Sequence, residues 1–310
     1  MLKLEAALAF IAITEAGSIS EGARRQQISK SVASDRLAEL ERSLGTTLIH
    51  RTTRKFSLTE DGVAFYERAK RIAREVTDAT TEIAERRGEL AGPLRISAPM
   101  SFGTLHLGPA LYSFLKANPR IELSLELDDR FVGAADGYDA IIRHGPLPDN
   151  GLIVKRLAPS KRVLVASPAY LKKHGAPRTI ADLERHRGII YSIRGAADWR
   201  FRQSGRWRTV RPGGLMLVNN GIVMRDAAVE GLGIALLTTF IVHDALTRRK
   251  LTVVDVDAEA EPATIFIAYP NDRPASTKLL ALIAHLRAAF GSPPYWDRPS
   301  RGGASQSPAN

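Results

Sequence analysis

Residues 18–62 read SISEGARRQQISKSVASDRLAELERSLGTTLIHRTTRKFSLTEDG, and this stretch decides the fold of the first part of the chain. Ser18 and Glu21 have the spacing of a capping box, in which each side chain binds the other residue's backbone N–H, so a short helix begins here. The pattern breaks at residues 27–28, and Ser29 then caps a longer helix. The apolar face of that helix is formed by Ala33, Leu37, Leu40 and Leu44. A short helix, a tight turn and a longer helix predict a helix-turn-helix.

The residues on either side extend this motif to a small domain. An apolar stripe at helical spacing precedes it, formed by Leu4, Leu8 and Ile11. Gly17 and Gly45 end the helices that come before them. Residues 47–49 and 56–58 read as two short strands, and the basic segment between them, residues 50–55, is predicted to form the tip of a hairpin wing.

A long amphipathic helix is predicted next, beginning at Glu60 and Asp61 and ending near Arg87, a length of about 40 Å. Its apolar residues recur in alternating steps of four and three, as in a coiled-coil seam. They are Phe65, Ala69, Ile72, Val76, Ala79 and Ile83. The seam either packs on its own domain or pairs with a second copy. We expect dimerisation, because a helix about 40 Å long extends beyond a domain of 60 residues, so part of the seam cannot pack on that domain.

The rest of the chain alternates short apolar strands with helices, which predicts an α/β domain with predominantly parallel sheets. The expected strands are residues 94–97, 121–127, 138–143, 163–166, 215–218, 234–237 and 264–268. A final helix follows through Leu279, Leu282 and Leu286. Residues 291–310 are rich in Pro, Ser and Gly, and we expect a disordered tail there.

Composition limits the classes of protein that the chain can represent. It has 310 residues and no cysteine, which excludes disulfides, thiolate metal sites and thiol redox sensing. No apolar run approaches the roughly 18 residues that span a bilayer. Residues 1–16 contain Lys3, Glu5 and Glu15, unlike a secretory signal, so we expect a cytoplasmic protein.

The net charge of +11 indicates a polyanionic partner. Residues 24–55 hold eight basic and three acidic residues, so the helix-turn-helix and wing are locally basic. A second basic segment, residues 178–211, holds nine arginines against three acidic residues. A solvated face explains that segment best. A second phosphate-binding surface is the alternative, with Trp199, Phe201 and Trp207 interleaved among the arginines.

Three segments between Phe10 and Gly62 resemble the DNA-binding domain of the LysR-type transcriptional regulators. They are AFIAITEAGSISEGARR, ISKSVASDRLAELERSLGTTL and RTTRKFSLTEDG. The second half resembles the effector domain of the same family in GPLRISAPMSFG, YDAIIRHGPL, RVLVASPAYLKKHGAPRTIADLERHR and AAVEGLGIALL. The chain departs from the usual family pattern at Gln26, Gln27, Lys30 and Asp35, which makes the operator sequence hard to infer.

The resemblance implies an N-terminal α winged helix-turn-helix and a C-terminal α/β domain of two Rossmann-like subdomains resembling type 2 periplasmic binding proteins. The expected divisions are a DNA-binding domain at 1–60, a dimerisation helix at 61–87, a hinge at 88–93, an effector-binding domain at 94–290 and the tail at 291–310. The chain would pass to the second subdomain near residue 163 and return near residue 264. A ligand would bind in the cleft between the subdomains, where open α/β sheets place their sites.

Candidate DNA contacts lie at the start of the longer helix and in the wing, where hydroxyl, ammonium and guanidinium groups reach base edges or phosphates. They are Ser29, Lys30, Ser31, Ser34, Arg36, Arg51, Thr52 and Arg54. Taken singly, serines at a helix start are often only caps and wing arginines are often only solvated. Their occurrence together in this motif favours DNA contact.

Candidate effector contacts lie at strand ends and at a helix start in the second half. They are Ser101, Phe102, Asp129, Arg143, Asn219 and Thr238. A helix start at Ser101 favours an anion, whereas the acidic groups at Asp128 and Asp129 would select a cation. Arg143 is equally suited to a structural salt bridge with one of those acids. Asn219 is as well suited to shaping a turn, and Phe102 to the core.

No catalytic, cofactor or metal site is predicted. The seven histidines are scattered, and no nucleophile elbow, phosphate loop or dinucleotide motif opens a helix after a strand. A solute-binding transport protein would need a secretion signal, and a nucleoid protein would not need the second domain. The expected partners are double-stranded operator DNA, a small-molecule effector, a second copy through the long helix, a tetramer, and RNA polymerase.

Overall fold

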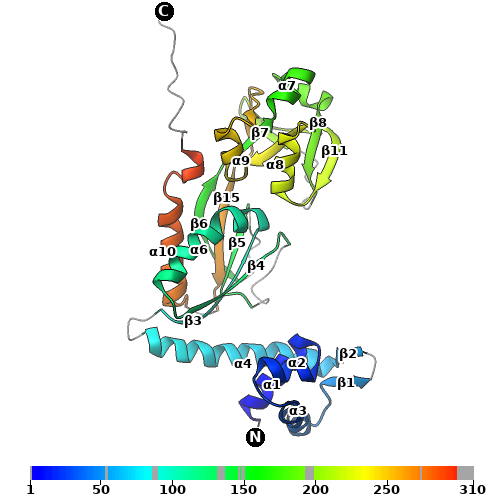
Figure 1. The fold of residues 1–310 in the computed structure, drawn as a ribbon, viewed down its shortest axis with the longest axis vertical. Coiled ribbons are helices and arrows are strands. Elements are labelled where there is room, and N and C mark those ends of the chain that lie inside the picture. The colour runs from blue at the N-terminus through cyan, green and yellow to red at the C-terminus, as the bar shows by residue number, and fades with distance from the viewer. Residues whose placement is uncertain are drawn as a thin grey trace, which may run out of the picture. The chain divides into compact units, whose positions relative to one another are not determined.

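The structure is a computed structural model that describes residues 2–52, 55–85, 90–130, 137–145, 147, 151–192, 199–272 and 274–298. The chain divides into two compact units, residues 1–89 and 90–310 (Figure 1). None of the helices in these described ranges is long and apolar enough to cross a membrane.

The first unit is a winged helix-turn-helix, as predicted. Its elements are α1 (Leu4–Ala16), α2 (Ile19–Arg25), α3 (Lys30–Leu44), β1 (Ile49–Thr52) and β2 (Lys55–Leu58). The two strands pair antiparallel, with Arg51 opposite Phe56 and Thr52 opposite Lys55. The strands therefore extend into the wing tip that we predicted at residues 50–55, and the tip is shorter than expected. Residues 53–54 lie outside the described residues.

The predicted caps begin α2 and α3. The Ser18 hydroxyl accepts a hydrogen bond from Glu21 N at 3.1 Å, but the Glu21 carboxylate binds Arg24. The reciprocal half of the expected capping box is therefore replaced by an ion pair within the helix. The Ser29 hydroxyl accepts from Val32 N at 3.2 Å and starts α3.

The core of the first unit lies between α1, α2, α3 and the wing, and it corrects the stripe that we expected on α1. Leu4 is exposed, whereas Ala6, Phe10 and Ile13 are buried. The small alanine lets α1 approach its neighbours closely, so Phe10 fills the centre of the core. The buried Glu41 carboxylate accepts hydrogen bonds from the backbone N–H groups of residues 48–49 and so ties α3 to the wing.

The predicted seam of helix α4 (Glu60–Glu85) is buried or half-buried in its first part and exposed in its second part. Phe65 stacks on Phe10 with ring centroids 5.7 Å apart, and Ala69 is buried, so this part packs on its own domain. Farther along the helix, Ile72 and Val76 are 52% and 42% exposed, and Ile83 is also exposed. The alternative of packing within the domain therefore holds only for the first turns.

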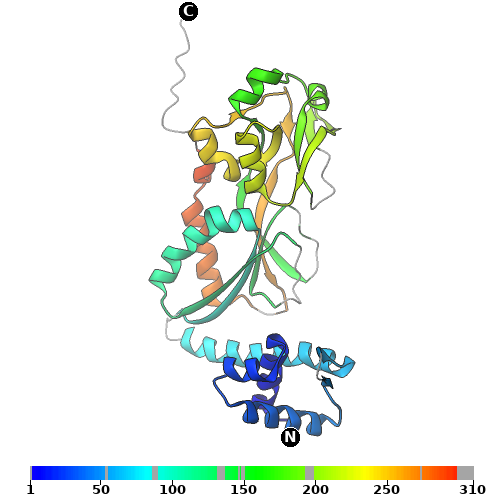
Figure 2. The ribbon, with the colours of Figure 1, turned by 45° about the vertical axis from the view of Figure 1, so that its right-hand side comes forward.

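The second unit consists of two lobes, each built on a five-stranded sheet (Figure 1, Figure 2). The first lobe has strand order β4-β3-β5-β15-β6, and helices α6 and α10 lie side by side against it. Its elements are β3 (Gly92–Ala98), α5 (Met100–Phe102), a π-helix (Gly103–Leu107), α6 (Gly108–Ala117), β4 (Ile121–Leu127), β5 (Ala140–His144), β6 (Leu152–Ser160), β15 (Ala263–Pro270) and α10 (Thr277–Phe290).

The second lobe has strand order β11-β8-β12-β7-β13, with α8 and α9 packed on it. Its elements are β7 (Arg162–Ala166), α7 (Pro168–His174), a 3-10 helix (Ala181–Arg185), β8 (Arg187–Tyr191), β11 (Gly213–Val218), α8 (Gly221–Val229), β12 (Ile234–Thr238), α9 (Thr239–Thr247) and β13 (Thr252–Val253). A small antiparallel sheet adjoins this lobe and consists of β9 (Trp199–Gln203), β10 (Arg206–Val210) and β14 (Glu259–Ala260).

The chain passes between the lobes twice, close to the predicted positions. Strand β6 ends at Ser160 in the first sheet and β7 begins at Arg162 in the second, and the chain returns through β15. These connecting strands run antiparallel to their neighbours, as the pairs β15–β6, β15–β5 and β12–β7 show. The sheets are therefore mixed, and the expectation of predominantly parallel sheets was wrong for this reason.

The structure differs from the expected tail at residues 291–298, which fold back onto the lobes. A 3-10 helix (Tyr295–Asp297) contacts α9, and Trp296 is only 2% exposed. Its indole packs against His106, Tyr295 and Phe290 with centroids between 4.6 and 5.3 Å apart. We predicted disorder because this segment is rich in Pro, Ser and Gly. An average composition does not show that one large aromatic side chain among the prolines is buried. Residues 299–310 lie outside the described residues.

We predict that Trp296→Ala lowers the free energy of unfolding by about 3–5 kcal/mol, because it removes a fully buried aromatic side chain. Denaturant unfolding followed by circular dichroism measures the change. The matched control is Trp207→Ala, since Trp207 is 47% exposed. Equal effects of the two substitutions would show that the C-terminal segment does not contribute to the core.

Candidate functional site

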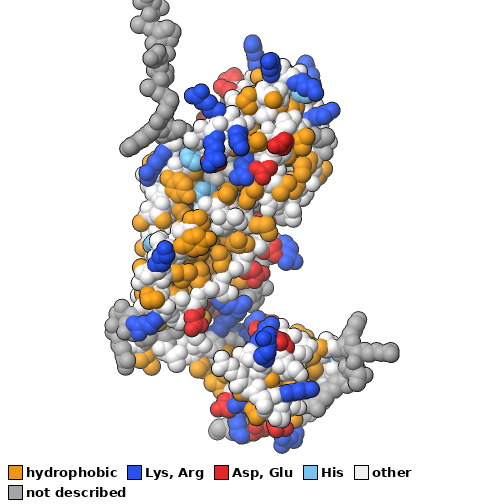
Figure 3. All heavy atoms as spheres, in the orientation of Figure 1, with side chains coloured by type: hydrophobic (Ala, Val, Ile, Leu, Met, Phe, Trp, Pro, Cys, Tyr) orange, Lys and Arg blue, Asp and Glu red, His pale blue; other side chains and the backbone are white. Residues whose placement is uncertain are grey.

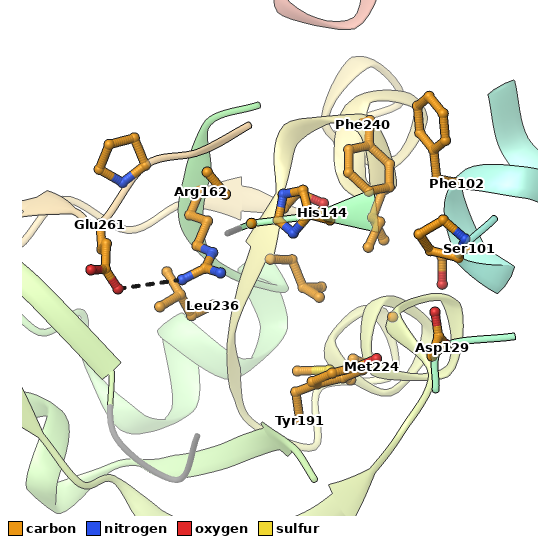
Figure 4. Close-up of a pocket in the computed structure, with 18 of the residues that line it drawn as sticks. Ser101, Phe102, Asp129, His144, Arg162, Tyr191, Met224, Leu236, Phe240 and Glu261 are labelled. Atoms are coloured by element: carbon orange, nitrogen blue, oxygen red, sulfur yellow. Dashed lines mark ion pairs between the residues drawn. The ribbon is translucent and has the colours of Figure 1, made fainter. Parts of the chain in front are cut away.

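A pocket of about 540 Å³ lies between the two lobes of the second unit and is lined by residues of both (Figure 4). The first lobe contributes Pro99, Ser101, Phe102, Asp129, Arg143 and His144. The second lobe and the chain around it contribute Arg162, Tyr191, Met224, Leu236, Thr238, Phe240 and Glu261, among others. This volume suits a small metabolite.

The structure brings together five of the six residues that sequence analysis proposed for the effector. Ser101, Phe102, Asp129, Arg143 and Thr238 all line the pocket. Asn219 is not among the lining residues, and its side chain is exposed. The neighbouring residue, Asn220, caps α8 by accepting hydrogen bonds from the backbone N–H groups of residues 222–223. Asn219 and Asn220 therefore fit the alternative that they shape the turn before α8.

Ser101 and Asp129 form one polar end of the pocket, and their side chains point toward one another (Figure 4). The Asp129 carboxylate accepts a hydrogen bond from Met100 N at 3.1 Å. A carboxylate of the chain itself therefore occupies the helix start that we assigned to an anionic ligand. Burial raises the pKa of Asp129 above its ordinary value, and the Met100 N–H and the Arg143 charge only partly offset this.

Arg143, on β5, also lines the pocket and is 3% exposed. Its guanidinium donates hydrogen bonds to Ile142 O at 2.7 Å, Ser97 Oγ at 2.9 Å and Arg130 O at 3.1 Å. Asp128 forms its own ion pair with Arg130 at 2.6 Å. Neutral oxygens thus accept hydrogen bonds from the Arg143 guanidinium, and its positive charge acts to lower the pKa of Asp129.

An arginine pair forms the other polar end, which sequence analysis missed. Glu261 accepts from Arg200 at 2.7 Å and lies 3.9 Å from Arg162, so one carboxylate is shared between two guanidinium groups. Arg200 also stacks over Trp207 at 5.3 Å. Because Glu261 lies about 100 residues from Arg162 in sequence, no local pattern pointed to this group.

Thr238 joins the arginine end to a helix. Thr238 is the residue before α9, and its side chain does not cap that helix. Its Oγ1 is buried and has no hydrogen-bond partner among the described residues. Thr238 is also directly opposite Arg162 in the antiparallel ladder of β12 and β7, so the two side chains lie on neighbouring strands of one sheet.

Aromatic side chains form the wall between the lobes. Phe102 is buried and packs edge-on against Phe240 and Phe290, so it belongs to the core as well as to the pocket lining. His106, on the π-helix, lies between Phe240 O at 2.8 Å and the Tyr295 hydroxyl at 2.6 Å. Since the carbonyl only accepts, Nε2 carries the proton and Nδ1 accepts from Tyr295.

The candidate DNA contacts lie at the start of α3. Lys30 and Ser31 are exposed, Ser34 is half-buried, and the Ser29 and Ser31 hydroxyls lie 2.9 Å apart. Arg36 forms an ion pair with Glu5 at 2.8 Å. Arg51 and Thr52 lie on β1, but their side chains are outside the described residues, as is all of Arg54.

Comparison with known proteins identifies both units. Residues 4–63 match the family described as bacterial regulatory helix-turn-helix protein, lysR family, and residues 87–291 match the LysR substrate binding domain. The chain belongs to the LysR family of transcriptional regulators. A DNA-binding helix-turn-helix and an effector-binding domain are therefore its two functional parts.

Relatives match along nearly the whole LysR-type chain. The uncharacterised HTH-type regulator YhjC of Escherichia coli is 33% identical and covers 90% of this chain and 95% of its own. An uncharacterised HTH-type regulator of Haemophilus influenzae is 31% identical, covering 91% and 99%. The full-length structure of AphB, a Vibrio cholerae virulence activator, has a TM-score of 0.61 at 27% identity, covering 92% and 98%.

The second basic segment of this LysR-type regulator forms part of the surface of the second lobe, where Lys and Arg side chains gather (Figure 3). Arg202, Arg206 and Arg208 on the β9–β10 hairpin are exposed, in agreement with a solvated face. Among the described residues, no group of three or more His, Asp or Glu side chains could hold a metal ion.

We predict that the regulator loses stability as the pH falls below the ordinary histidine pKa of 6.5, partly through His106. Burial lowers the pKa of His106 in the folded chain, so the unfolded chain binds the proton more readily. Thermal melts between about pH 8 and pH 5 test this, and His106→Gln should reduce the pH-dependent difference. His50→Gln, at an exposed position, should leave that difference unchanged. An unchanged difference in His106→Gln would contradict the prediction.

Proposed function

We propose that this regulator binds operator DNA through the start of α3 and the wing, and that a small molecule in the interlobe pocket controls that binding. The pocket is the observation that carries the proposal, because both lobes contribute charged side chains to it. A ligand there contacts both lobes and therefore binds one interlobe geometry better than another. Differential affinity of this kind shifts the population of conformations.

The proposed DNA contacts come from α3 and the wing. They are Ser29, Lys30, Ser31, Ser34, Arg36, Arg51, Thr52 and Arg54. Lys30 and Ser31 are the strongest candidates, because their side chains are exposed on the first turn of α3. Arg36 would have to exchange Glu5 for a phosphate. Ser29 acts mainly as the cap that fixes the helix start.

We predict that Lys30→Ala weakens operator binding and lowers the slope of log affinity against log salt by about one unit, as expected for one lost phosphate contact. Fluorescence anisotropy over a salt series measures both quantities. Lys116→Ala, which removes an exposed lysine from α6, is the matched control. Unchanged affinity and slope in Lys30→Ala would remove the start of α3 from the interface.

The proposed effector contacts are Ser101, Phe102, Asp129, Arg143 and Thr238, joined by Arg162 and Glu261. Ser101 and Asp129 supply hydrogen-bond acceptors, and Thr238 and Arg162 supply donors. Phe102 shapes the apolar wall. Arg143 acts mainly through its charge, since neutral oxygens already accept hydrogen bonds from its guanidinium.

The regulator forms a homodimer through the exposed part of α4 in this proposal. Ile72, Val76 and Ile83 lie at heptad spacing on a helix that continues past the core of its own domain. Apolar side chains in such a row are stabilised by pairing with a second copy. Two copies would present two α3 helices to the two halves of an interrupted palindrome.

We predict that Ile72→Asp combined with Val76→Asp converts the dimer into monomers, because the pairing would bury charge in an apolar seam. Analytical ultracentrifugation measures the change. Glu67→Lys, on the opposite side of α4, is the control and should remain dimeric. A double variant that sediments as a dimer would place the interface elsewhere.

The regulator acts in the cytoplasm, where it reaches the chromosome, and it carries no enzymatic activity. Dimers pair into tetramers through the effector domains, and RNA polymerase is the partner that would read the change at the promoter. Sequencing of DNA crosslinked to the regulator in its host would identify the operators.

A further inference from the structure

The Thr238 end of the pocket is built to receive an anion. Thr238 is 6% exposed, lines the pocket, and has a buried hydroxyl without a partner among the described residues. A buried polar group is ordinarily hydrogen-bonded, because leaving it unpaired is costly. A ligand oxygen in the pocket would supply the missing partner. This is one observation that points to a ligand.

Helix α9 supplies the second observation. It has nine residues and begins directly after Thr238, and no side chain caps its first turn. Phe240 and Ile241, both in that first turn, line the pocket. By contrast, Asn220 caps the neighbouring helix α8 with its own side chain. The Thr239 N–H already donates to Lys161 O at 2.9 Å, so the helix dipole and the N–H groups farther into the first turn favour a negative charge at the start of α9.

Two arginines lie at this end of the pocket. Arg162 lies directly opposite Thr238 on the neighbouring strand. Arg162 and Arg200 share the single carboxylate of Glu261. Two guanidinium groups at this end suit a ligand with a carboxylate near Thr238, because guanidinium groups form strong hydrogen bonds with carboxylates.

The Ser101 end has the opposite chemistry. Asp129 presents a carboxylate to the pocket, and one of its oxygens already accepts from Met100 N at 3.1 Å. That N–H is therefore not available to a ligand anion. Ser101, beside Asp129, is 6% exposed and adds a hydroxyl oxygen. A second anion here would face a carboxylate at short range, whereas an ammonium group would find two acceptors.

Apolar groups separate these two ends. Leu236, Met224 and Phe240 line the pocket between Arg162 and Asp129 (Figure 4). Gly221 restricts the pocket from the side of the second lobe, because a Cβ there would collide with Ile241 and come within 3.3 Å of Ser101 Oγ. The available space therefore suits a compact ligand with an apolar portion.

We propose that the effector is a small zwitterion of the amino-acid class, with its carboxylate at Thr238, Arg162 and the start of α9, and its ammonium group at Asp129 and Ser101. This inference rests on the proposed function and specifies the ligand class of the same pocket. Because the two charged groups bind different lobes, only a ligand that carries both of them bridges the lobes.

A matched ligand panel tests the class. The full-length chain is melted by differential scanning fluorimetry with alanine, valine, leucine and lysine. The same melts are repeated with the 2-hydroxy acids, unsubstituted carboxylates and primary amines of the same carbon skeletons. We expect at least one amino acid to raise the melting temperature and its single-charge analogues to fail. A larger rise with a simple carboxylate or amine would overturn the proposal, as would no rise with any amino acid.

Two isosteric variants then test the two ends separately, with calorimetric titration of the amino acid that gave the rise. Asp129→Asn removes the charge at the ammonium end, and Thr238→Val removes the hydroxyl at the carboxylate end. We expect each to weaken binding by roughly tenfold or more. Thr238→Val should also melt no earlier than the wild type without ligand, because it removes an unpaired buried hydroxyl.

The neighbouring residues provide matched controls. Asp128→Asn changes the adjacent acid, which pairs with Arg130 and does not line the pocket. Thr247→Val removes the hydroxyl of another threonine of α9, in the last turn of the helix, which donates to His243 O at 2.9 Å and does not line the pocket. Both controls should keep wild-type affinity. Equal losses in variants and controls would show that binding depends on general stability and would overturn the assignment.

Operator binding by the same preparations separates this inference from the proposed function. Wild type and the two control variants are expected to bind operator DNA without added ligand. If they bind DNA but the amino-acid panel fails, the ligand class is wrong and the regulator assignment stands. If an amino acid binds as described but operator binding is absent, the proposed DNA interface is wrong and the ligand class stands.

Discussion

The antiparallel pairing of β6 with β15 is the interaction on which the rest of the second unit depends. Ser160 lies opposite Ala263 at the point where both strands leave the first sheet, so the two passages between the lobes are hydrogen-bonded to each other. A single passage would let the lobes rotate freely, whereas a paired ribbon restricts them to bending. The aromatic groups of Phe102, His106 and Trp296 then pack against Phe240 of the second lobe, and the pocket lies where residues of both lobes meet at this junction.

Satisfied and unsatisfied polar groups are distributed unevenly over the chain. The buried carboxylate of Glu41 binds two backbone N–H groups, and the buried guanidinium of Arg143 binds three oxygens. At the pocket, Thr238 combines a buried hydroxyl without a partner among the described residues with the uncapped start of α9, whereas Thr14 and Trp296 have unpartnered polar atoms that do not line the pocket. A fold tolerates such local exceptions mainly where they serve a function. The same physical rule describes the core and supports the proposed place of the ligand at Thr238.

Much of the candidate site could be predicted from local sequence, because strand ends and helix starts are local features. Ser101, Asp129 and Thr238 each follow a recognisable strand, and all three line the pocket. The charge preference at Ser101 could not be predicted in this way. The helix start there favours an anion in isolation, but the Asp129 carboxylate reaches it from another strand and binds its N–H. The Glu261 bridge was missed for the same reason, since its partners are distant in sequence.

Local sequence patterns predicted the caps of α2 and α3 and the wing, and the family resemblance implied the two functional parts and the points where the chain changes lobes. The caps and the wing depend on hydrogen bonds and periodicities within a few residues, so local chemistry is sufficient to predict them. Only the tertiary structure decided which half of the α4 seam is exposed, that the sheets are mixed, that Trp296 closes the aromatic core, and which end of the pocket is acidic. Each of these depends on contacts between residues far apart in the chain, and burial and Coulomb interactions depend on distance in space.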